Sequence, residues 1–332
     1  MRLAFDARDR RKPHSSYART LSLLQESARA VGLEAEEWTD GPCGAEVLWS
    51  PQRKPAPVRG PRQVLTVHDI NPLVPGTRGR LARIRRELGF RLSMRRTRRR
   101  AWRLATDSED AARRLRQAFP GPGPRLGVVP LYASSRFRPG PPPAALLERL
   151  GLAPGYLLFV GALRRHKNWE LLLQAYARLP ASLQRSRPLV LAGPPRRQET
   201  RAQRLAKALG IEGKVRLPGI LGDEDLAGLL RGAGLFLFPS LAEGFGLPPL
   251  EALASGVPVL SSDRTSLPEV LGPAARYADP TDPADWARAL EALLADPGSL
   301  AELGAAGPAW AARYGPERTG RAMLSLLEEG ED

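Results

Sequence analysis

The chain has 332 residues, a hydrophobic content of 42% and a single cysteine, Cys43. This length exceeds the size at which one hydrophobic core usually divides, so we expect two domains. A lone cysteine excludes an internal disulfide, and no run of about 18 apolar residues is present to span a membrane. The charged start MRLAFDARDR lacks the apolar region of a signal peptide, so we expect a cytoplasmic protein.

The excess positive charge is confined to the first part of the chain. Residues 1–140 hold 29 Lys and Arg against 13 Asp and Glu, a net charge of +16, whereas the other 192 residues hold 21 against 22. Only five of the 50 basic residues are lysines, and Pro, Ala, Leu and Gly are abundant, which is typical of a GC-rich genome such as a thermophile's. That bias does not explain the asymmetry, which favours an anionic partner for the first part.

Short apolar runs alternate with helical patterns through the first half. We expect strands at 2–5, 47–49, 64–67, 104–106 and 127–129, and helices at 16–31 and 108–119. Segment 78–103 contains twelve arginines and one glutamate. Its apolar residues recur at spacings of three and four, which places them on one side of a helix: Leu81, Ile84, Leu88 and Leu92. We expect this stripe to pack on the domain core and the basic face to point outward.

The second half has the clearer pattern. The proline- and glycine-rich segment 139–155 predicts a linker. After it, apolar strands at 156–160, 188–192, 215–217, 235–238 and 257–260 alternate with helices at 169–179, 200–209, 224–233, 249–254 and 266–271. A last helix is expected at 316–329. The alternation predicts a parallel sheet covered on both faces, with ligands beyond the carboxyl ends of its strands.

Several common sites are not supported by the sequence. No G-x-G-x-x-G follows the first strand, and neither a P-loop nor a G-x-S-x-G elbow is present. The three histidines and the cysteine do not have metal-ligand spacing, so we expect no metal site.

The most informative stretch is 235–262, LFLFPSLAEGFGLPPLEALASGVPVLSS. A strand, a glycine loop and a helix beginning near Pro248 offer backbone N–H groups and the positive end of a helix dipole to a phosphate. Two carboxylates eight residues apart, Glu243 and Glu251, bracket this helix start. In isolation the same residues would suit an ordinary turn, a solvated loop carboxylate and a charge that complements the dipole.

The string FPS-x-x-EGFGLPPLEA-x-x-SG-x-P resembles the donor-site signature of the retaining family 4 glycosyltransferases, which are group 1 glycosyltransferases. Further matches, strongest over 156–290, are YLLFVGALRRHKN, VRLPGIL, SLPEVLG, LTVHDINPLVPG, TDSEDAARRL and VVPLYASSRFRP. The resemblance implies a GT-B fold, with two doubly wound Rossmann-like domains facing a central cleft. It implies an acceptor-side domain at 1–138, the linker at 139–155, a nucleotide-sugar domain at 156–311, and a C-terminal helix at 312–332 that crosses back onto the first domain.

The resemblance also assigns roles. Lys167 would neutralise the donor diphosphate, Glu251 would bind the donor ribose and Glu243 would contact the transferred sugar. His68 would contact the donor sugar or orient the acceptor. The remaining expected donor contacts are the arginines Arg164 and Arg165, the base-side residues Gly219 and Ile220, and the phosphate loop of Gly244, Phe245, Gly246 and Leu247.

The chain departs from the family pattern at two places. Many members have an arginine where this chain has Ala162, so Arg164 or Arg165 is expected to reach the phosphates instead. The glycine loop after the first strand is replaced by RKPHSSY, of which only Tyr17 matches. That loop borders the acceptor in the family, so the acceptor is the part of the function that the resemblance specifies least.

The implied activity is retaining, metal-independent transfer of a hexose, mannose-like or other, from a GDP- or UDP-linked sugar to a glycan or lipid-linked acceptor. No further cofactor is expected. Residues 78–103 are expected to bind an anionic membrane surface at the inner face of the plasma membrane, and no specific nucleic acid is expected. Three alternatives stay open: a glycogen-synthase-like or phosphorylase-like variant, a non-catalytic family member, and a nucleic-acid-binding protein that uses 78–103.

Overall fold

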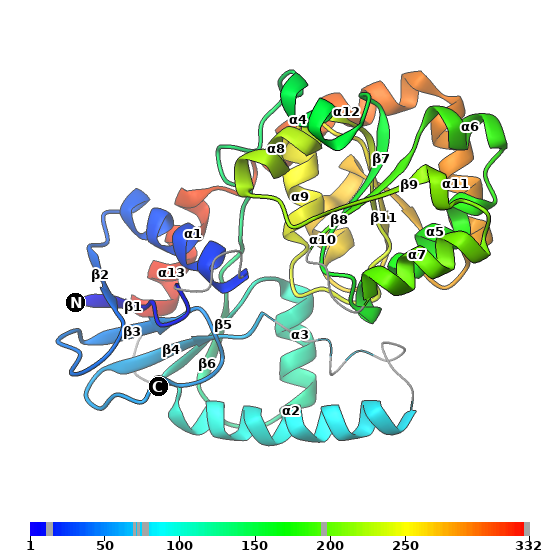
Figure 1. The fold of residues 1–332 in the computed structure, drawn as a ribbon. Helices are drawn as coiled ribbons and strands as arrows, with labels where there is room; N and C mark the ends of the chain where they lie inside the picture. The colour runs from blue at the N-terminus through cyan, green and yellow to red at the C-terminus, as the bar shows by residue number, and fades with distance from the viewer. Residues whose placement is uncertain (11–15, 69–70, 72–73, 75–79, 194–197, 329–332) are drawn as a thin grey trace. The chain divides into compact units, whose positions relative to one another are not determined.

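The computed structural model describes residues 1–10, 16–68, 71, 74, 80–193 and 198–328, without the side chains of 16, 80–83 and 198–199. The chain divides into two compact units, one formed by residues 1–132 with 314–332 and the other by 133–313. Each unit contains a six-stranded sheet whose described strand pairs are parallel (Figure 1). The predicted pair of doubly wound sheets is confirmed.

The sheet of the first unit has the order β2-β1-β3-β4-β5-β6. Its strands are β1 (Leu3–Asp6), β2 (Ala35–Trp38), β3 (Val47–Ser50), β4 (Arg62–Thr66), β5 (Arg103–Thr106) and β6 (Arg125–Val128), and its helices are α1 (Ser16–Ala30), α2 (Arg80–Arg100), α3 (Glu109–Ala118) and α13 (Pro316–Glu328). The sequence did not predict β2, because this edge strand reads AEEW and only its tryptophan is buried.

The C-terminal helix α13 completes the core of the first unit. Its apolar side chains Met323, Leu326 and Leu327 are buried in one cluster with residues of β1, α1 and β3. Gly320 permits the close approach of α13 to α1, because a Cβ at this position would lie 2.4 Å from the carbonyl oxygen of Ser27. The predicted return of the last helix to the first domain is confirmed.

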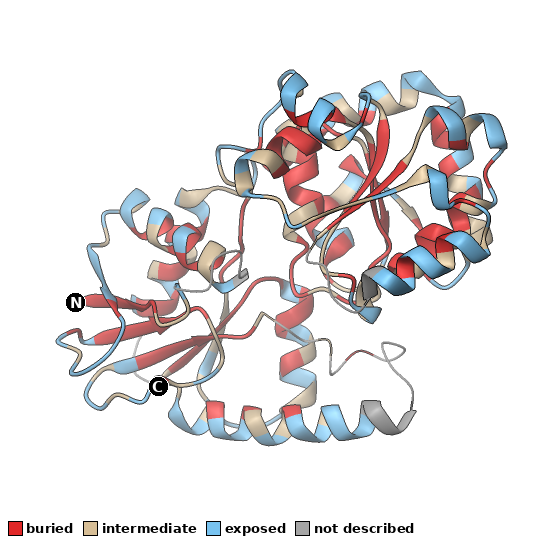
Figure 2. Ribbon diagram, viewed as in Figure 1, coloured by how far each residue is buried: buried red, intermediate tan, exposed pale blue. Residues whose placement is uncertain are grey.

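Helix α2 turns a different face to the core from the one predicted. Among its described side chains, Phe90, Met94 and Thr97 are buried, whereas Ile84, Leu88 and Leu92 are exposed. Figure 2 shows α2 as a mostly exposed helix with short buried stretches. The prediction that the leucine and isoleucine stripe packs inward was therefore wrong. A second, less obvious apolar pair four residues apart, Phe90 and Met94, packs inward instead. The side chain of Leu81 and residues 78 and 79 lie outside the described residues.

The sheet of the second unit has the order β12-β11-β10-β7-β8-β9. Its strands are β7 (Tyr156–Val160), β8 (Leu189–Ala192), β9 (Val215–Gly219), β10 (Ala233–Phe238), β11 (Val259–Ser262) and β12 (Arg276–Ala278). Its helices are α4 (Ala144–Leu150), α5 (Trp169–Ala177), α6 (Ala181–Ser186), α7 (Gln198–Ala208), α8 (Asp223–Gly232), α9 (Leu247–Ala254), α10 (Leu267–Leu271), α11 (Pro283–Ala295) and α12 (Pro297–Ala311). Helix α5 packs with α7 and α11, and α9 packs with α10 and α12.

Segment 139–155, where a linker is predicted, contains helix α4 and belongs to the second unit. Leu146 and Leu147 of this helix are buried. Helix α4 packs on α8, and Arg149 forms an ion pair with Asp225 at 2.5 Å. The chain passes from the first unit to the second at Tyr132, before the proline-rich residues. Within the described residues, no helix is long and apolar enough to cross a membrane.

The close contact at Gly320 predicts a stability change. Gly320→Ala should lower the free energy of unfolding by about 1–3 kcal/mol, because the new methyl group must push α13 away from the backbone of α1. Gly89→Ala is the matched control, since Gly89 lies in α2 with no atom within 4 Å of the added Cβ. It should raise stability by about 0.5–1 kcal/mol through helix propensity. Urea unfolding followed by circular dichroism measures both changes, and equal effects would contradict the packing argument.

Candidate functional site

The strand order of the second sheet brings two distant loops together. From β7 the chain adds β8 and β9 on one side, and then returns to add β10, β11 and β12 on the other. Neighbours β7 and β10 are therefore the point where the winding reverses, and their following loops emerge side by side at the carboxyl edge. Ligands of open parallel sheets bind at such a reversal point.

A lysine and a glutamate from these two loops form an ion pair. Lys167 Nζ donates to Glu243 Oε1 at 2.7 Å, and their side chains are 15% and 12% exposed. The hydroxyl of Ser240 donates to the same oxygen at 2.5 Å. Lys167 Nζ also lies 5.0 Å from the ring centroid of Phe238, within cation–π range. Two residues predicted separately from the sequence thus form one charged cluster.

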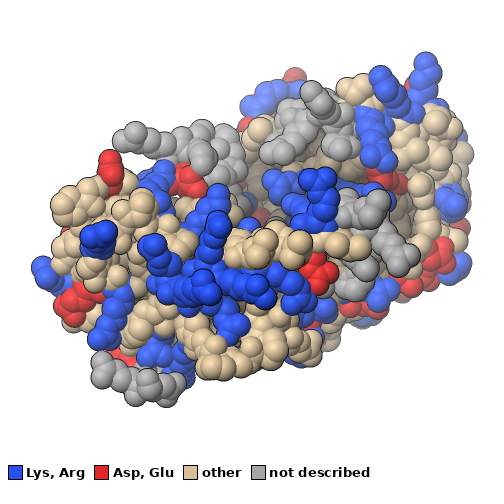
Figure 3. Space-filling model, turned by 90° about the horizontal axis from the view of Figure 1, so that it is seen from below, with Lys and Arg blue, Asp and Glu red and all other residues tan. Residues whose placement is uncertain are grey.

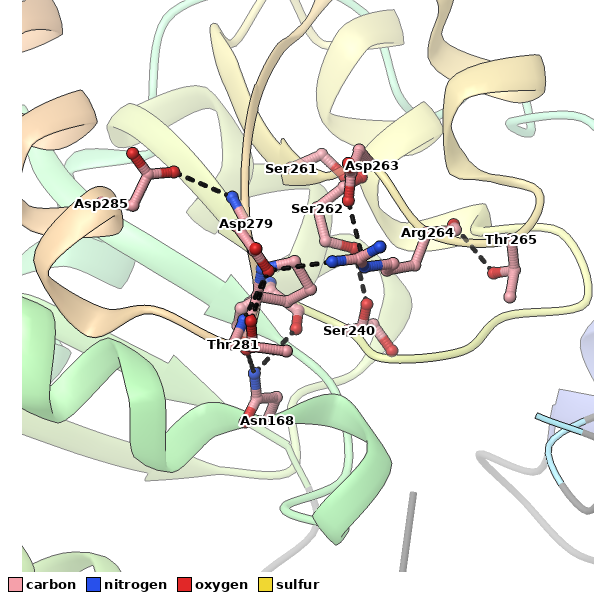
Figure 4. Close-up of polar contacts among 12 residues, drawn as sticks. Asn168, Ser240, Ser261, Ser262, Asp263, Arg264, Thr265, Asp279, Thr281 and Asp285 are labelled. Atoms are coloured by element: carbon pink, nitrogen blue, oxygen red, sulfur yellow. Dashed lines mark hydrogen bonds and ion pairs between the residues drawn. The ribbon is translucent and has the colours of Figure 1, made fainter. Parts of the chain in front are cut away.

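Asn168 ties the β7 loop to its neighbours. It follows the 3-10 turn Arg165–Lys167 and has a left-handed backbone, with φ of 56°. Its Nδ2 donates to the carbonyl oxygen of Pro280 at 2.7 Å and of Pro239 at 3.2 Å (Figure 4). The backbone N–H of Leu241 donates to the carbonyl of His166 at 2.8 Å. Loops that follow β7, β10 and β12 are therefore held together directly beside Lys167.

Thr265 holds the other member of the pair. The backbone N–H of Glu243 donates to Thr265 Oγ1 at 2.9 Å. Thr265 has a φ of 55°, and among the described residues it shares a positive φ with only one other non-glycine residue, Asn168. Asparagine tolerates this conformation, but a β-branched threonine in it is strained. Asn168 directly follows Lys167, and Thr265 accepts a hydrogen bond from Glu243, so both residues border the ion pair. Strained backbone of this kind is concentrated at functional sites.

An ionic network anchors the strained loop (Figure 4). Arg264 Nη2 donates to Asp279 Oδ1 at 2.9 Å, and Arg264 also pairs with Asp263 at 3.2 Å. Hydrogen bonds from the hydroxyl and the backbone N–H of Thr281, together with Arg264, lower the pKa of Asp279 below its ordinary value. A lowered pKa means that the Asp279 carboxylate favours the folded state above its ordinary pKa, and that this contribution is lost as the pH falls through the lowered value.

Glycines let the other loops at this edge meet backbone to backbone. A Cβ on Gly193, after β8, would lie 2.1 Å from the carbonyl oxygen of Gly161, after β7. The N–H of Gly193 donates to the carbonyl of Gly219 at 2.9 Å. Gly219 has a φ of 76° and is followed by Ile220, which is 49% exposed. The predicted base-side residues Gly219 and Ile220 therefore belong to the same group of loops as Lys167.

The predicted phosphate loop leads into helix α9. Gly246 is its N-cap with φ of 104°, where a Cβ would lie 2.7 Å from Leu267 Cδ2. Ser266 Oγ donates to the carbonyls of Glu243 at 3.2 Å and Phe245 at 2.9 Å, which fixes the loop on both sides of Gly244. The helix itself begins at Leu247.

Glu251, in the second turn of α9, is 1% exposed. It is not the solvated surface charge that would merely complement a helix dipole. Burying a carboxylate costs free energy unless polar groups interact with it, so the burial of Glu251 favours a specific role for this residue.

Arg164 and Arg165 are exposed at the surface of the β7 loop, next to the half-buried Ala162. The N–H of Arg164 donates to the carbonyl of Ala162 at 2.6 Å in a tight turn. Which of the two arginines takes the place of the family arginine stays a prediction.

His68 belongs to the first unit and has acceptors on both ring nitrogens. Nδ1 lies 2.7 and 2.9 Å from the two carboxylate oxygens of Asp107, and Nε2 lies 2.9 Å from the carbonyl oxygen of Pro51. Only the imidazolium form can donate to both acceptors. The ring centroids of Tyr17 and His68 lie 6.2 Å apart. Asp69 and residues 11–15 lie outside the described residues.

The sequence analysis missed the residues that position the predicted ones. Asp107 lies 39 residues from His68 in the chain, and Thr265 lies 22 residues from Glu243. Serine, threonine and aspartate at loop positions carry no periodic signal. Within the part of the chain that the structure describes, there is no group of three His, Cys, Asp or Glu side chains arranged to hold a metal ion.

Comparison with protein families agrees with this arrangement. The family model described as "Glycosyl transferases group 1" matches residues 149–310, which include both members of the ion pair and Glu251. Residues 149–310, just under half of the chain, are therefore similar to the group 1 glycosyltransferases. Curated relatives include the O-antigen chain mannosyltransferase B of Escherichia coli, 39% identical over 182 residues. Another is a D-inositol 3-phosphate glycosyltransferase of Streptomyces bingchenggensis, 33% identical over 240 residues.

These matches cover 54% and 68% of this chain, but only 48% and 52% of the two relatives, so the chain matches about half the length of each. Solved structures agree in fold over almost the whole chain. A sucrose-phosphate synthase of Thermosynechococcus elongatus has a TM-score of 0.76 at 17% identity and covers 98% of both chains. The Anabaena protein HepE in complex with UDP and glucose has a TM-score of 0.77 at 16% identity, covering 99% of this chain and 100% of its own. The predicted GT-B fold is confirmed.

The Thr265 hydroxyl provides a test of how Glu243 is held. Thr265→Val should lower the free energy of unfolding by about 1–2 kcal/mol, because the backbone N–H of Glu243 loses its acceptor while the backbone strain stays. Thr265→Ser keeps the hydroxyl and removes the β-branch, so its stability should equal or exceed that of the wild type. Urea unfolding compares the three proteins. A valine variant as stable as the serine variant would show that this hydrogen bond does not hold Glu243.

Proposed function

We propose that this protein is a retaining glycosyltransferase that moves a hexosyl group from a nucleoside diphosphate sugar to a glycan or lipid-linked acceptor, without a metal ion. The observation that carries the proposal is the Lys167–Glu243 ion pair at the reversal point of the second sheet. It combines a cation suited to a diphosphate with a carboxylate suited to sugar hydroxyls. The family match over residues 149–310 and the mannosyltransferase and glycosyltransferase names of the relatives support this assignment.

Lys167 would act on the leaving group. As the bond between the sugar and the phosphate breaks, negative charge grows on the departing nucleoside diphosphate. The Lys167 ammonium has three N–H donors, and Glu243 uses one of them in this structure. The others can reach phosphate oxygens, aided by the N-terminus of α9 at Phe245, Gly246 and Leu247. A donor held in this way loses its leaving group on one face, and retention follows when the acceptor hydroxyl attacks from that face.

The carboxylates would bind the neutral parts of the donor. Glu243 would accept a hydrogen bond from a hydroxyl of the transferred hexose, and Glu251 from the ribose hydroxyls. Gly219 and the exposed Ile220 lie at the end of β9 and would meet the base. The base is uridine or guanosine in this proposal, and HepE, a structural neighbour, was solved with UDP.

The acceptor would be a glycan or lipid-linked saccharide of a cell-envelope polysaccharide, met at the inner face of the plasma membrane. The support is the O-antigen mannosyltransferase name of a relative together with the basic first part of the chain. His68 would orient the acceptor or contact the donor sugar. Both nitrogens of its ring lie within hydrogen-bond distance of protein acceptors, which suits a positioning role.

Two variants separate the roles of lysine and glutamate. Lys167→Ala should lower kcat about 100-fold and weaken binding of the intact nucleotide sugar far less, because the charge that Lys167 stabilises grows in the transition state. Glu251→Gln should weaken nucleoside diphosphate binding about tenfold, because a charged hydrogen-bond acceptor of the ribose becomes neutral. Isothermal titration and donor hydrolysis rates measure the two quantities.

The matched control is Lys207→Ala, an exposed lysine of α7 in the same unit, which should change neither quantity. Unchanged affinity in both Glu251→Gln and Glu251→Ala, with folding intact, would remove the ribose role. A loss of nucleotide-sugar affinity in Lys167→Ala as large as its loss of kcat would mean that Lys167 binds the ground state and the transition state equally.

Metal independence is tested by chelation. Transfer in the presence of EDTA should stay within about twofold of the untreated rate, because Lys167 and the α9 N-terminus supply the positive charge that the leaving group needs. The rate is measured as nucleoside diphosphate release from the cognate donor. Loss of activity in EDTA that Mg²⁺ or Mn²⁺ restores would contradict the proposal.

A further inference from the structure

Helix α2 exposes an apolar ridge to solvent. Six large hydrophobic side chains are exposed among the described residues, and three of them are on this helix: Ile84 at 51%, Leu88 at 56% and Leu92 at 50%. A spacing of four residues places them one above the other on one face of the helix. Scattered exposed apolar residues are ordinary, but a continuous ridge on a single helix marks an interaction surface.

The opposite face of α2 packs against the rest of the first unit. This packing fixes the orientation of the helix, and with it the outward position of the ridge. Phe90 and Met94 are buried, and Arg53 lies 5.1 Å from the ring centroid of Phe90. Thr97 Oγ1 donates to the carbonyl of Arg53 at 2.9 Å. Arg98 donates to the carbonyls of Phe119, Gly121 and Pro122 in the loop after α3. These contacts require Ile84, Leu88 and Leu92 to face outward.

Arginines surround the ridge and continue it. Arg91 and Arg98 donate to backbone carbonyls, and the other arginines of α2 whose side chains are described are exposed: Arg85, Arg86, Arg95, Arg96, Arg99 and Arg100. The only acidic residue of α2, Glu87, forms an ion pair with Arg91. Figure 3, which views the molecule from the side of α2, shows Lys and Arg gathered across this face. The face therefore carries the apolar ridge between residues 84 and 92 and is strongly cationic between residues 95 and 100.

We propose that this face of α2 docks on an anionic lipid bilayer, with the helix lying in the plane of the interface and Ile84, Leu88 and Leu92 inserted among the acyl chains. An exposed aliphatic ridge beside many arginines is the composition of interfacial helices. Single-stranded nucleic acid would require aromatic stacking side chains, and the outward ridge consists of aliphatic ones. The docking deepens the proposed function, because it names the surface at which a lipid-linked acceptor is met, but it requires no glycosyl transfer.

This arrangement differs from attraction by charge alone. Each arginine near an anionic surface strengthens binding about fivefold, and this part of the affinity is screened by salt. Insertion of the ridge adds an apolar contribution that salt does not screen. The two contributions can therefore be separated by variants and by ionic strength.

Co-sedimentation with vesicles tests the proposal in the full-length protein. Vesicles of phosphatidylglycerol and phosphatidylcholine should bind the wild type, and pure phosphatidylcholine vesicles should bind it at least tenfold more weakly. The triple variant Ile84→Ser, Leu88→Ser, Leu92→Ser should lose at least tenfold in affinity at both low and high salt. The variant Arg95→Gln, Arg96→Gln, Arg99→Gln, Arg100→Gln should lose more than tenfold at low salt and show a weaker salt dependence. Arg98 is left unchanged because it holds the loop after α3.

The charge-matched control should bind the anionic vesicles with an affinity within about twofold of the wild type. It replaces four exposed arginines of the second unit: Arg185→Gln, Arg204→Gln, Arg216→Gln and Arg276→Gln. A second readout is independent of overall folding. An environment-sensitive dye attached through Leu88→Cys, in a Cys43→Ser background, should shift to shorter wavelength on anionic vesicles, whereas the same dye attached through Arg185→Cys should not.

Three results would overturn the proposal. The first is a wild-type protein that stays in the supernatant with anionic vesicles at low salt. The second is a ridge variant that binds as the wild type does while the arginine variant fails, which would leave attraction by charge alone. The third is a change from dimer to monomer in the ridge variant without lipid, which would make the ridge an interface between copies. Because no sugar is present, these outcomes are independent of the outcome of the Lys167 and Glu251 tests.

Discussion

The Lys167–Glu243 ion pair depends on two parallel strands that are neighbours in space and distant in sequence. Strands β7 and β10 pair at the centre of the second sheet, so the loops after them emerge together. One loop carries Lys167 and the other carries Glu243, 76 residues later, and their side chains meet at 2.7 Å. Parallel pairing of β7 with β10 thus brings a cation and an anion from two distant loops to one point.

The surroundings of the pair indicate function more than stability. An ion pair this well covered gains little net free energy, because both charges lose much of their hydration. The chain also keeps Asn168 and Thr265 in left-handed backbone conformations to hold the two loops, and the threonine is strained there. An orientation maintained at such a cost is expected where reacting groups must be held within a fraction of an ångström.

The sequence specified the strands well and the loops poorly, for a physical reason. Buried parallel strands are continuous apolar runs, so β7 was predicted at its observed bounds, whereas the exposed edge strand β2 carries no such signal. A helix within segment 78–103 was predicted, but its two apolar faces could not be ranked without knowing that Phe90 packs beneath Arg53. The resemblance predicted roles for Lys167, Glu243 and Glu251, but not the Lys167–Glu243 ion pair or the contact of Thr265 with Glu243, because hydrogen bonds between loops depend on tertiary position alone.

Amide hydrogen exchange with and without nucleotide tests the central claim that the loops after β7 and β10 bind a nucleoside diphosphate. Saturating UDP or GDP should slow exchange in residues 164–168 and 244–247 and leave residues 1–132 unchanged. The amide of Glu243, already donating to Thr265, should exchange slowly in both states and serve as an internal reference. Protection that is missing from both loops with either nucleotide, or that is confined to residues 1–132, would contradict the account.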